Sequence, residues 1–420
     1  MKKLPSPDSL SVRNIIRSRR FAVLLFIAIT AILYLFLSNA RPQAFSLNTA
    51  DGHDMLAYVS SSDQLMLYDP RDRTETALLD DVRSFKLSPD GRVAFKKLDE
   101  NDTVLYIFDP SSDTLTPVIT ENPDAYNSPL AWSPDGRYLA FGSYHEPEGL
   151  SLYVWDGETA TNVMPENPLA AAVRFYVDWS HDGRLAFQVI YGWSNLDIPP
   201  EVYVWDGHTM TNLNPNPDGW DGYASWSEDG KLLFGSRRDD DFSYYVWDGV
   251  SFKDGLPDAD TFIPVAPELE PDYPVWVTDN IIAFSVNRQF LIFPRNIIML
   301  WDVESGRVIS EYPVSSDNAW SYLAEGGQVI ISSHLASGLP SYYLDVESTE
   351  GQILFTTETG EYAWSPDGYL AYCRTDGRPG GSINWVLSLW DGQESWDVTR
   401  VSYRPAQWQS EQYTFSCNNG

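Results

Sequence analysis

The chain has 420 residues, of which 43% are hydrophobic and 14% aromatic, and this composition excludes a largely disordered protein. Its formal net charge of −31 at pH 7 excludes a general affinity for nucleic acid or anionic lipid, because those surfaces carry the same sign of charge. The length is sufficient for one large core.

The first 40 residues differ in composition from the rest of the chain. Residues 1–20 contain six basic residues and one acidic residue, Asp8, and residues 21–37 contain no charge. The stretch 21–40 reaches the ~20 residues that a helix needs to cross a bilayer, and a basic flank is typical of the cytoplasmic side. We predict a cytoplasmic tail (1–20), one transmembrane helix (21–40), a linker (41–50) and a domain (51–420) outside a bacterial-type cell membrane.

A cleaved signal peptide is the alternative for this N-terminus. The stretch 38–40 offers small residues to a signal peptidase. The apolar run before it, however, is longer than the ~7–15 residues of a signal core. The sequence therefore favours an anchor that stays attached to the chain.

From residue 51 onward, one short pattern recurs: an apolar anchor residue, a turn of the Ser-Pro-Asp-Gly type, and a brief apolar strand. The anchors are Leu87, Trp132, Trp179, Trp226, Trp276, Leu323, Trp364 and Trp408, which lie 41 to 50 residues apart. A repeat of about 40–50 residues built from short strands predicts an all-β fold, a β-propeller with one four-stranded antiparallel blade per repeat.

Each repeat also carries a signature for its third strand, such as Tyr153–Gly157, and there are eight such signatures. The first signature, at Tyr68, has no anchor before it, and the last anchor, Trp408, has no signature after it. Joining them forms an eighth blade from both ends of the chain. Residues 51–58 and 413–417 both resemble its second strand, so we expect eight blades and keep seven as the alternative.

The two cysteines, Cys373 and Cys417, each lie nine residues after an anchor. Equivalent strand positions of neighbouring blades are usually too far apart for a disulfide. We therefore expect two buried thiols, with a bridge as the alternative.

The Trp-Ser-Pro-Asp-Gly turns at 132–136 and 364–368, and the Leu-Ala-Phe strand at 139–141, resemble the WD-like repeats of the TolB propeller. They are also similar to the propeller of prolyl-oligopeptidase relatives. The resemblance covers about residues 50–420 and implies a propeller fold with a tendency to bind proteins. The α/β domain of TolB-like proteins and the hydrolase domain of the peptidases have no counterpart in this sequence, so no activity is implied.

Motifs that carry chemistry are missing from the sequence. It contains no Gly-x-Ser-x-Gly elbow, no His-Glu-x-x-His, no Cys-x-x-Cys and no Walker loop. The five histidines fall in different repeats, and the acidic run 239–241 lacks the spaced oxygen ligands of a calcium loop. We predict no catalytic residues, no metal and no cofactor.

Candidate binding residues lie between the repeats. We expect short turns on one face of the ring and longer connections on the other, at about 188–201, 213–223, 254–272, 285–296 and 373–385. Trp193, Trp220 and Trp385 map to these connections, with Tyr191 and Asn195 beside Trp193. Exposed aromatic side chains on loops anchor partners or stack on sugars, although they can also fold down as local core.

These features favour a membrane-anchored, extracytoplasmic propeller that acts as a non-catalytic protein-binding or scaffolding module. One alternative is an enzyme acting on envelope glycan or peptide, with acids drawn from several loops. A second alternative is glycan binding without hydrolysis. The sequence does not predict an oligomeric state.

Overall fold

The computed structural model describes the following residues, and every structural statement below refers to them: 54–97, 104–118, 126–145, 149–164, 172–191, 199–213, 220–239, 241–253, 256–257, 261–266, 272–290, 293–313, 320–323, 329–335, 342–348, 353–365, 367–375, 385–401, 405–408 and 415–416. Residues 44–420 form one compact unit. The predicted tail (1–20), transmembrane helix (21–40) and linker (41–50) lie outside the described residues. None of the described segments is a helix of the length and apolarity that crossing a membrane requires.

The described segments are all-β and pair as antiparallel sheets. The β4 sheet contains β4 (Val82–Leu87), β5 (Val93–Lys97), β6 (Leu105–Asp109) and β7 (Thr114–Val118). The β8 sheet contains β8 (Tyr126–Trp132), β9 (Leu139–His145), β10 (Gly149–Trp155) and β11 (Ala160–Asn162). The β12 sheet contains β12 (Ala172–Trp179), β13 (Leu185–Tyr191), β14 (Glu201–Trp205) and β15 (Met210–Asn212).

The next sheets repeat this order. The β16 sheet contains β16 (Asp221–Trp226), β17 (Leu232–Asp239), β18 (Asp241–Trp247) and β21 (Ile263–Pro264). A small separate hairpin joins β19 (Phe252–Lys253) to β20 (Leu256–Pro257). The β22 sheet contains β22 (Asp272–Thr278), β23 (Ile281–Phe290), β24 (Phe293–Asp302) and β25 (Arg307–Pro313).

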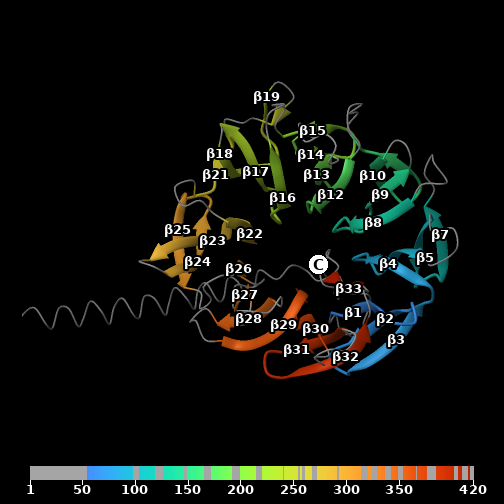
Figure 1. Cartoon of the computed structure of the whole chain (residues 1–420). Helices are drawn as coiled ribbons and strands as arrows, with labels where there is room; N and C mark the ends of the chain where they lie inside the picture. Colours follow the sequence, from blue (N-terminus) through green and yellow to red (C-terminus); the bar gives the residue numbers. More distant parts are fainter. Residues whose placement is uncertain are drawn as a thin grey trace, which may run out of the picture. The chain divides into compact units, whose positions relative to one another are not determined.

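One long strand, β29 (Ile353–Trp364), belongs to two strand sets. Its first part completes β26 (Trp320–Leu323), β27 (Val329–Leu335) and β28 (Tyr342–Ser348). Its second part begins a set with β30 (Leu370–Thr375), β31 (Trp385–Trp390) and β32 (Ser395–Val401). In Figure 1 the sheets follow one another around a common centre, with the first strand of each set innermost, which is a β-propeller arrangement.

The recurring turn is stabilised by hydrogen bonds among its own residues. At residues 133–136, the Gly136 amide donates to Ser133 O (2.8 Å) and the Ser133 hydroxyl donates to the Asp135 carboxylate (2.7 Å). The Asp135 carboxylate also accepts the Arg137 amide at 3.0 Å. Gly136 has φ +72°, in the region that favours glycine. The aspartate of this turn therefore has a structural role.

Neighbouring sheets are joined through the anchor residues. The indole N–H of Trp132 donates to Lys86 O at 3.2 Å, that of Trp179 to Ala131 O at 3.2 Å, and that of Trp276 to Ser225 O at 3.0 Å. Each bond runs from one sheet to the innermost strand of the preceding sheet.

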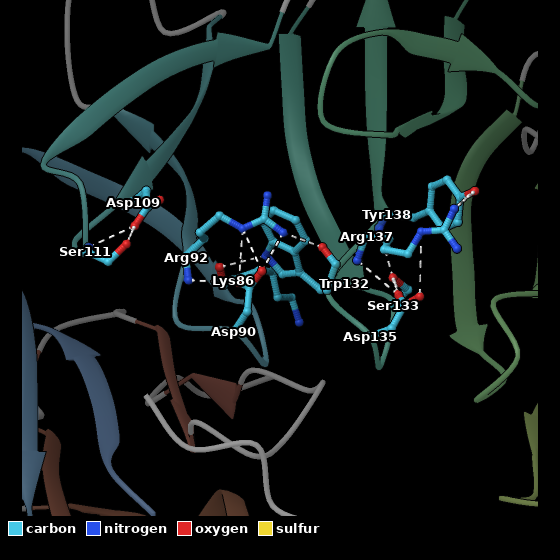
Figure 2. Close-up of polar contacts among 11 residues, drawn as sticks. Lys86, Asp90, Arg92, Asp109, Ser111, Trp132, Ser133, Asp135, Arg137 and Tyr138 are labelled. Atoms are coloured by element: carbon cyan, nitrogen blue, oxygen red, sulfur yellow. Dashed lines mark hydrogen bonds and ion pairs between the residues drawn. The ribbon is translucent and has the colours of Figure 1, made fainter. Parts of the chain in front are cut away.

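Arginine side chains reinforce the same junctions at the turns. The Arg92 guanidinium lies 4.8 Å from the centre of the Trp132 ring, and its Nη2 pairs with Asp90 (2.7 Å) and donates to Gly136 O (2.5 Å). Figure 2 shows this side chain reaching from one hairpin to the next. Cation–π contact and charge-assisted hydrogen bonds therefore add to the apolar packing between sheets.

The two ends of the described chain meet in one sheet. β33 (Pro405–Trp408) pairs with β1 (Leu56–Val59), which continues to β2 (Leu65–Asp69) and β3 (Thr74–Leu79). The side chain of Gln407 accepts the Leu87 amide of the next sheet at 3.2 Å. The predicted closure by both ends is confirmed by this pairing. β1 takes the second-strand position, and β34 (Phe415–Ser416) pairs with the opposite edge of β33.

The expectation of two free thiols is wrong. Cys373 on β30 is disulfide-bonded, and Cys417, the other cysteine of the sequence, lies outside the described residues. The prediction assumed equivalent strand positions in adjacent blades. Because β1 already occupies the second-strand position beside β33, β34 lies along the other edge of β33, close to β29.

Two of the expected long connections also differ from the structure. Residues 285–296 form most of the β23–β24 hairpin instead of a loop, with ten paired positions between Ile281↔Asp302 and Phe290↔Phe293. In the stretch 254–272, β21 is the fourth strand of its sheet, so the β19–β20 hairpin lies between the third and fourth strands. That connection belongs to the turn face.

We predict that removing the disulfide weakens ring closure. Replacing Cys373 by Ser should lower the free energy of unfolding by about 2–4 kcal/mol, because the bridge restricts the unfolded chain between the two cysteines. Equilibrium denaturation with and without dithiothreitol measures this effect. The reductant should lower the stability of the wild type to that of the Cys373→Ser variant and leave the variant unchanged; equal wild-type curves under both conditions would contradict the prediction.

Candidate functional site

The structure describes three of the five predicted site residues. Trp193 and Asn195 lie outside the described residues. Tyr191 is the last residue of β13, where it pairs with Ala172 of β12, and its side chain is not described. Trp220 immediately precedes β16 and is 39% exposed.

Trp385 does not lie in a connection. It is the first residue of β31, pairs with Thr375 and Val401, and is only 5% exposed. Its indole packs in an apolar cluster with Leu56 and Tyr58. The continuous apolar run of β31 explains this position, because both faces of the strand are covered. The expectation that Trp385 belongs to an exposed loop is wrong.

Trp220 forms a compact aromatic group with two residues of β18. Its ring centre lies 5.0 Å from that of Phe242 at an angle of 71°, and Phe242 in turn meets Tyr244 edge-on at 5.1 Å. Phe242 is 36% exposed. Edge-to-face contacts of this kind stabilise the rings beyond their burial, so Trp220 is held in a defined position although its side chain faces solvent.

Two strand glycines make room for this group. A Cβ atom added at Gly222 would lie 3.2 Å from the six-membered ring of Trp220, and one added at Gly235 would collide with Cζ of Phe242. The paired positions Gly222 and Gly235 therefore form a flat backbone floor under the rings.

A polar contact connects Trp220 to the preceding sheet. Gln188 on β13 donates from Nε2 to the carbonyl of Asp221 at 3.1 Å, and Asp221 is the residue after Trp220. The buried Asp221 carboxylate accepts the Ser236 hydroxyl at 2.5 Å. Tyr176 on β12 is the cross-strand partner of Gln188 and is 53% exposed. Tyr176 thus lies on the same sheet face as the residue that contacts the Trp220 segment.

We call Tyr144, Tyr176, Trp220 and Phe242 the aromatic arc. They are all the exposed aromatic residues among those the structure describes, and they come from three consecutive sheets, the β8, β12 and β16 sheets. Tyr144 (44% exposed) lies near the end of β9, and Phe242 near the start of β18, so both are next to second-to-third-strand connections.

Sequence reasoning found one residue of the arc and missed three. Tyr144, Tyr176 and Phe242 occupy strand positions, where an aromatic residue is usually core. A small residue accompanies two of them: Gly235 lies under Phe242, and Gly142 precedes Tyr144 by two positions in the sequence. Which strand positions lie opposite each other is a property of the folded chain, and a single sequence does not reveal it.

An acidic side chain links the β12 and β16 sheets on the innermost strands. The Asp178 carboxylate accepts the Trp226 amide at 2.7 Å, and also hydrogen bonds from the Trp179 backbone and the Ser225 side chain. Burial raises the pKa of Asp178 to about 6, and these hydrogen bonds only partly offset that effect. The Asp178 carboxylate thus accepts three hydrogen bonds and links two sheets, which is typical of a residue with a structural role.

The described residues offer little acid–base or metal chemistry. No group of three or more His, Cys, Asp or Glu side chains that could hold a metal occurs among the residues that the structure describes. Turn aspartates such as Asp156 are held ionised, because the amides of Thr159 and Glu158 lower the pKa of its carboxyl. The arrangement at the arc is suited to contact with a ligand.

Comparison with known proteins gives fold-level likeness. No protein-family model matches the chain, and no curated protein sequence matches it. Similar solved structures include a prolyl endopeptidase (13% identity, 91% of this chain and 60% of that chain, TM-score 0.48). TolB from Acinetobacter baumannii (18%, 72% and 79%, TM-score 0.33) and the β-propeller domain of the Trilobed protease from Pyrococcus furiosus (12%, 70% and 92%, TM-score 0.42) are also similar.

This chain therefore spans about three fifths of the prolyl endopeptidase. At these identities and TM-scores the likeness concerns the fold alone, and the propeller assignment rests on the strand pairing described above. TolB and other β-propeller proteins are among the similar structures, as the sequence repeat led us to expect.

We predict that Asp178 makes stability depend on pH. Its folded pKa of about 6 lies above the unfolded value, so the fold disfavours its charged form and its contribution to stability rises as pH falls from about 7 to about 4. Asp178→Asn keeps an acceptor for the Trp226 amide without the charge. Relative to wild type, the variant should gain about 2 kcal/mol in unfolding free energy on going from pH 4.5 to pH 7.5.

Urea denaturation at the two pH values measures this difference between variant and wild type. Asp178→Ala is the matched control for the lost acceptor and should be destabilised at both pH values. A difference between Asp178→Asn and wild type that does not change with pH would contradict the raised pKa.

We predict that Gly235→Ala disturbs the aromatic arc from below. The added methyl group collides with Phe242 and forces its ring to move, which should cost about 1–3 kcal/mol of unfolding free energy. Gly142→Ala is the control, because a Cβ there meets only Leu150 Cδ1 at 3.4 Å. Thermal unfolding of both variants is the measurement, and equal stability of the two would argue against a tight floor under Phe242.

Proposed function

We propose that the protein is a membrane-anchored, extracytoplasmic, eight-bladed β-propeller that binds an envelope ligand without catalysis. The observation that carries the proposal is the aromatic arc, four exposed rings on three consecutive sheets of a rigid scaffold. Exposed and preorganised aromatic side chains are the usual anchors of binding surfaces.

The strand pairing supports eight blades. The β4, β8, β12, β16 and β22 sheets provide five sets of four strands, and the two sets that share β29 provide two more. The closing sheet of β33 and β1–β3 provides the eighth. The pairs between β10 and β12, at Leu150↔Ala172, and along β29 merge neighbouring blades without changing this count.

Two features support the location outside the membrane. The uncharged stretch 21–40 with its basic flank favours an anchored domain on the external side. The disulfide at Cys373 favours an oxidising compartment, because such bonds are rare where thiols are kept reduced.

A non-catalytic role is supported by the polar groups near the arc. Asp221 and Asp178 both accept hydrogen bonds from other parts of the scaffold. A general acid or base needs access to the substrate proton, whereas these carboxylates connect strands and sheets.

We predict that the arc captures the ligand. The double variant Trp220→Ala/Phe242→Ala removes two adjacent exposed rings, so capture of full-length protein by isolated cell-envelope fractions should fall at least fivefold. The measurement is a sedimentation pull-down quantified by immunoblot.

Leu115→Ala is the matched control, because Leu115 is exposed on the outer strand β7 and lies on a different sheet. It should bind as the wild type does. Unchanged capture of the double variant, with an unfolding temperature close to that of the wild type, would place the binding site elsewhere.

A further inference from the structure

We infer that the end of the β23–β24 hairpin is a separate interaction surface and that it binds an anionic phospholipid bilayer. This inference goes beyond the proposed function and does not depend on the aromatic arc. We call residues 286–290 and 293–297 the hairpin end. Three observations support the inference: the extension of this hairpin beyond its neighbouring strands, its charge pattern, and the register that places like residues opposite each other.

The β23–β24 hairpin is longer than the strands beside it. On one side β22 pairs with β23 only as far as Ser285, and on the other β25 pairs with β24 only as far as Ile297. The last four pairs of the hairpin therefore have no neighbouring strand among the described residues, and at ~3.4 Å per residue they extend about 14 Å. Two strands alone bury little apolar surface, so apolar residues at this end require contact with something outside the hairpin.

The hairpin differs in charge from the rest of the protein. The chain contains 59 acidic and 28 basic residues, yet no Asp or Glu occurs between Asp279 and Asp302. The only charged residues of that stretch are Arg288 and Arg295. The hairpin end is thus a positively charged segment of an acidic protein, which favours an anionic partner.

The register places the two arginines at one level of the hairpin. Arg288 is the cross-strand partner of Arg295, and like charges directly opposite each other destabilise an antiparallel pair. Hairpin formation therefore does not explain this pair. An anionic group that accepts hydrogen bonds from both guanidinium groups would offset the repulsion, and phosphate oxygens match that geometry.

The residues nearest the turn are apolar. The last described pair is Phe290 with Phe293, two positions beyond the arginines on each strand. In the sequence these residues flank Leu291 and Ile292, so the end is apolar in composition. Two positions correspond to ~7 Å, which matches the ~5–10 Å to which interfacial segments enter the boundary of headgroups and acyl chains. A bilayer offers phosphates and an apolar layer at this spacing, whereas a soluble anion would leave the phenylalanines uncovered.

The acidic body of the protein does not prevent this contact. The formal net charge of −31 excludes a general affinity for anionic lipid. Repulsion between exposed charges is, however, screened over ~8 Å at physiological ionic strength. The hairpin end extends farther than this beyond its neighbouring strands, so a local contact is compatible with an acidic body.

An intramolecular partner is the competing explanation for the arginines. The acidic run 239–241 joins β17 to β18 at the corresponding connection of the preceding sheet. If that run neutralised Arg288 and Arg295, replacing the arginines would lower thermal stability. If lipid neutralises them, their replacement relieves a like-charge pair, and the unfolding temperature should stay the same or rise.

The test uses the full-length protein in nanodiscs that contain phosphatidylcholine and one third phosphatidylglycerol. Phe290→Cys carries a nitrobenzoxadiazole label, attached without reductant so that the Cys373 disulfide stays intact. Doxyl-labelled lipid is placed either in the disc or in added vesicles of the same composition. In one of these two arms the emission should fall by about twofold or more, because the label enters the lipid interface. The same label at Leu115→Cys, exposed on β7 of another sheet, should not be quenched.

A double variant tests the arginines. Arg288→Gln/Arg295→Gln should reduce quenching of the label at position 290 about threefold, since the attraction to anionic headgroups is lost. Lipid without phosphatidylglycerol should have the same effect on the labelled protein with both arginines. Arg137→Gln/Arg307→Gln is the matched control, because it removes two exposed arginines at other places in the ring. It should leave quenching unchanged.

Three results would overturn the inference. The first is the absence of quenching in both arms. The second is equal quenching with and without phosphatidylglycerol, because no anionic headgroup would then be recognised. The third is a lower unfolding temperature of Arg288→Gln/Arg295→Gln with unchanged quenching, which would assign the arginines to an intramolecular contact. These variants leave Trp220 and Phe242 in place, so capture by envelope fractions tests the proposed function separately.

Discussion

The structure depends on one constraint: a four-stranded blade cannot bury both of its faces by itself. The apolar clusters show this directly, because they join residues of neighbouring sheets, as Ala140 and Leu152 of the β8 sheet pack with Phe187 of the β12 sheet. Each face is satisfied only by the next blade, so the series has to close. Pairing of β33 with β1 joins both ends of the described chain in one sheet, which closes the series. The anchor indoles that donate to the preceding sheet provide directional contacts within otherwise non-directional packing.

The residue that precedes each anchor differs from sheet to sheet, although every sheet packs against its neighbours. Gln407 and Asp178 occupy this position in two different sheets, and each accepts the anchor amide of the following sheet. Lys86 holds the same position in the β4 sheet, where burial lowers the pKa of its ammonium group to about 8. At the Asp178 junction, Trp226 makes its bond through the backbone amide, and among the described residues its buried indole N–H has no hydrogen-bond partner. The junction between the β12 and β16 sheets is thus built differently from its neighbours.

Much of the fold could be predicted from the sequence, because the period and the turn chemistry are local. The Trp132–Gly136 turn specifies its own hydrogen bonds, and the spacing of the anchors predicts where each sheet begins. The disulfide and the position of Trp385 could not be predicted in this way. The disulfide depends on which edge of β33 is left for β34 to pair with. The position of Trp385 depends on which residues between the repeats form strands. Both are properties of the closed ring. Trp220 could be identified because it lies outside the positions that the repeat uses for tryptophan. Tyr176 keeps a strand position and is nevertheless exposed.

The same reasoning separates the exposed aromatic residues from the aromatic residues at repeat positions. Aromatic residues at repeat positions are required for packing, so Trp132 and Trp247 are almost completely buried. An aromatic residue that faces solvent contributes little to that packing and exposes apolar area, which is unfavourable in water. Four such residues on consecutive sheets, two of them supported by strand glycines, are not explained by the stability of the propeller. On the function proposed above, a bound ligand would cover exposed parts of these rings, and the blades beneath would let that contact form without reordering the protein.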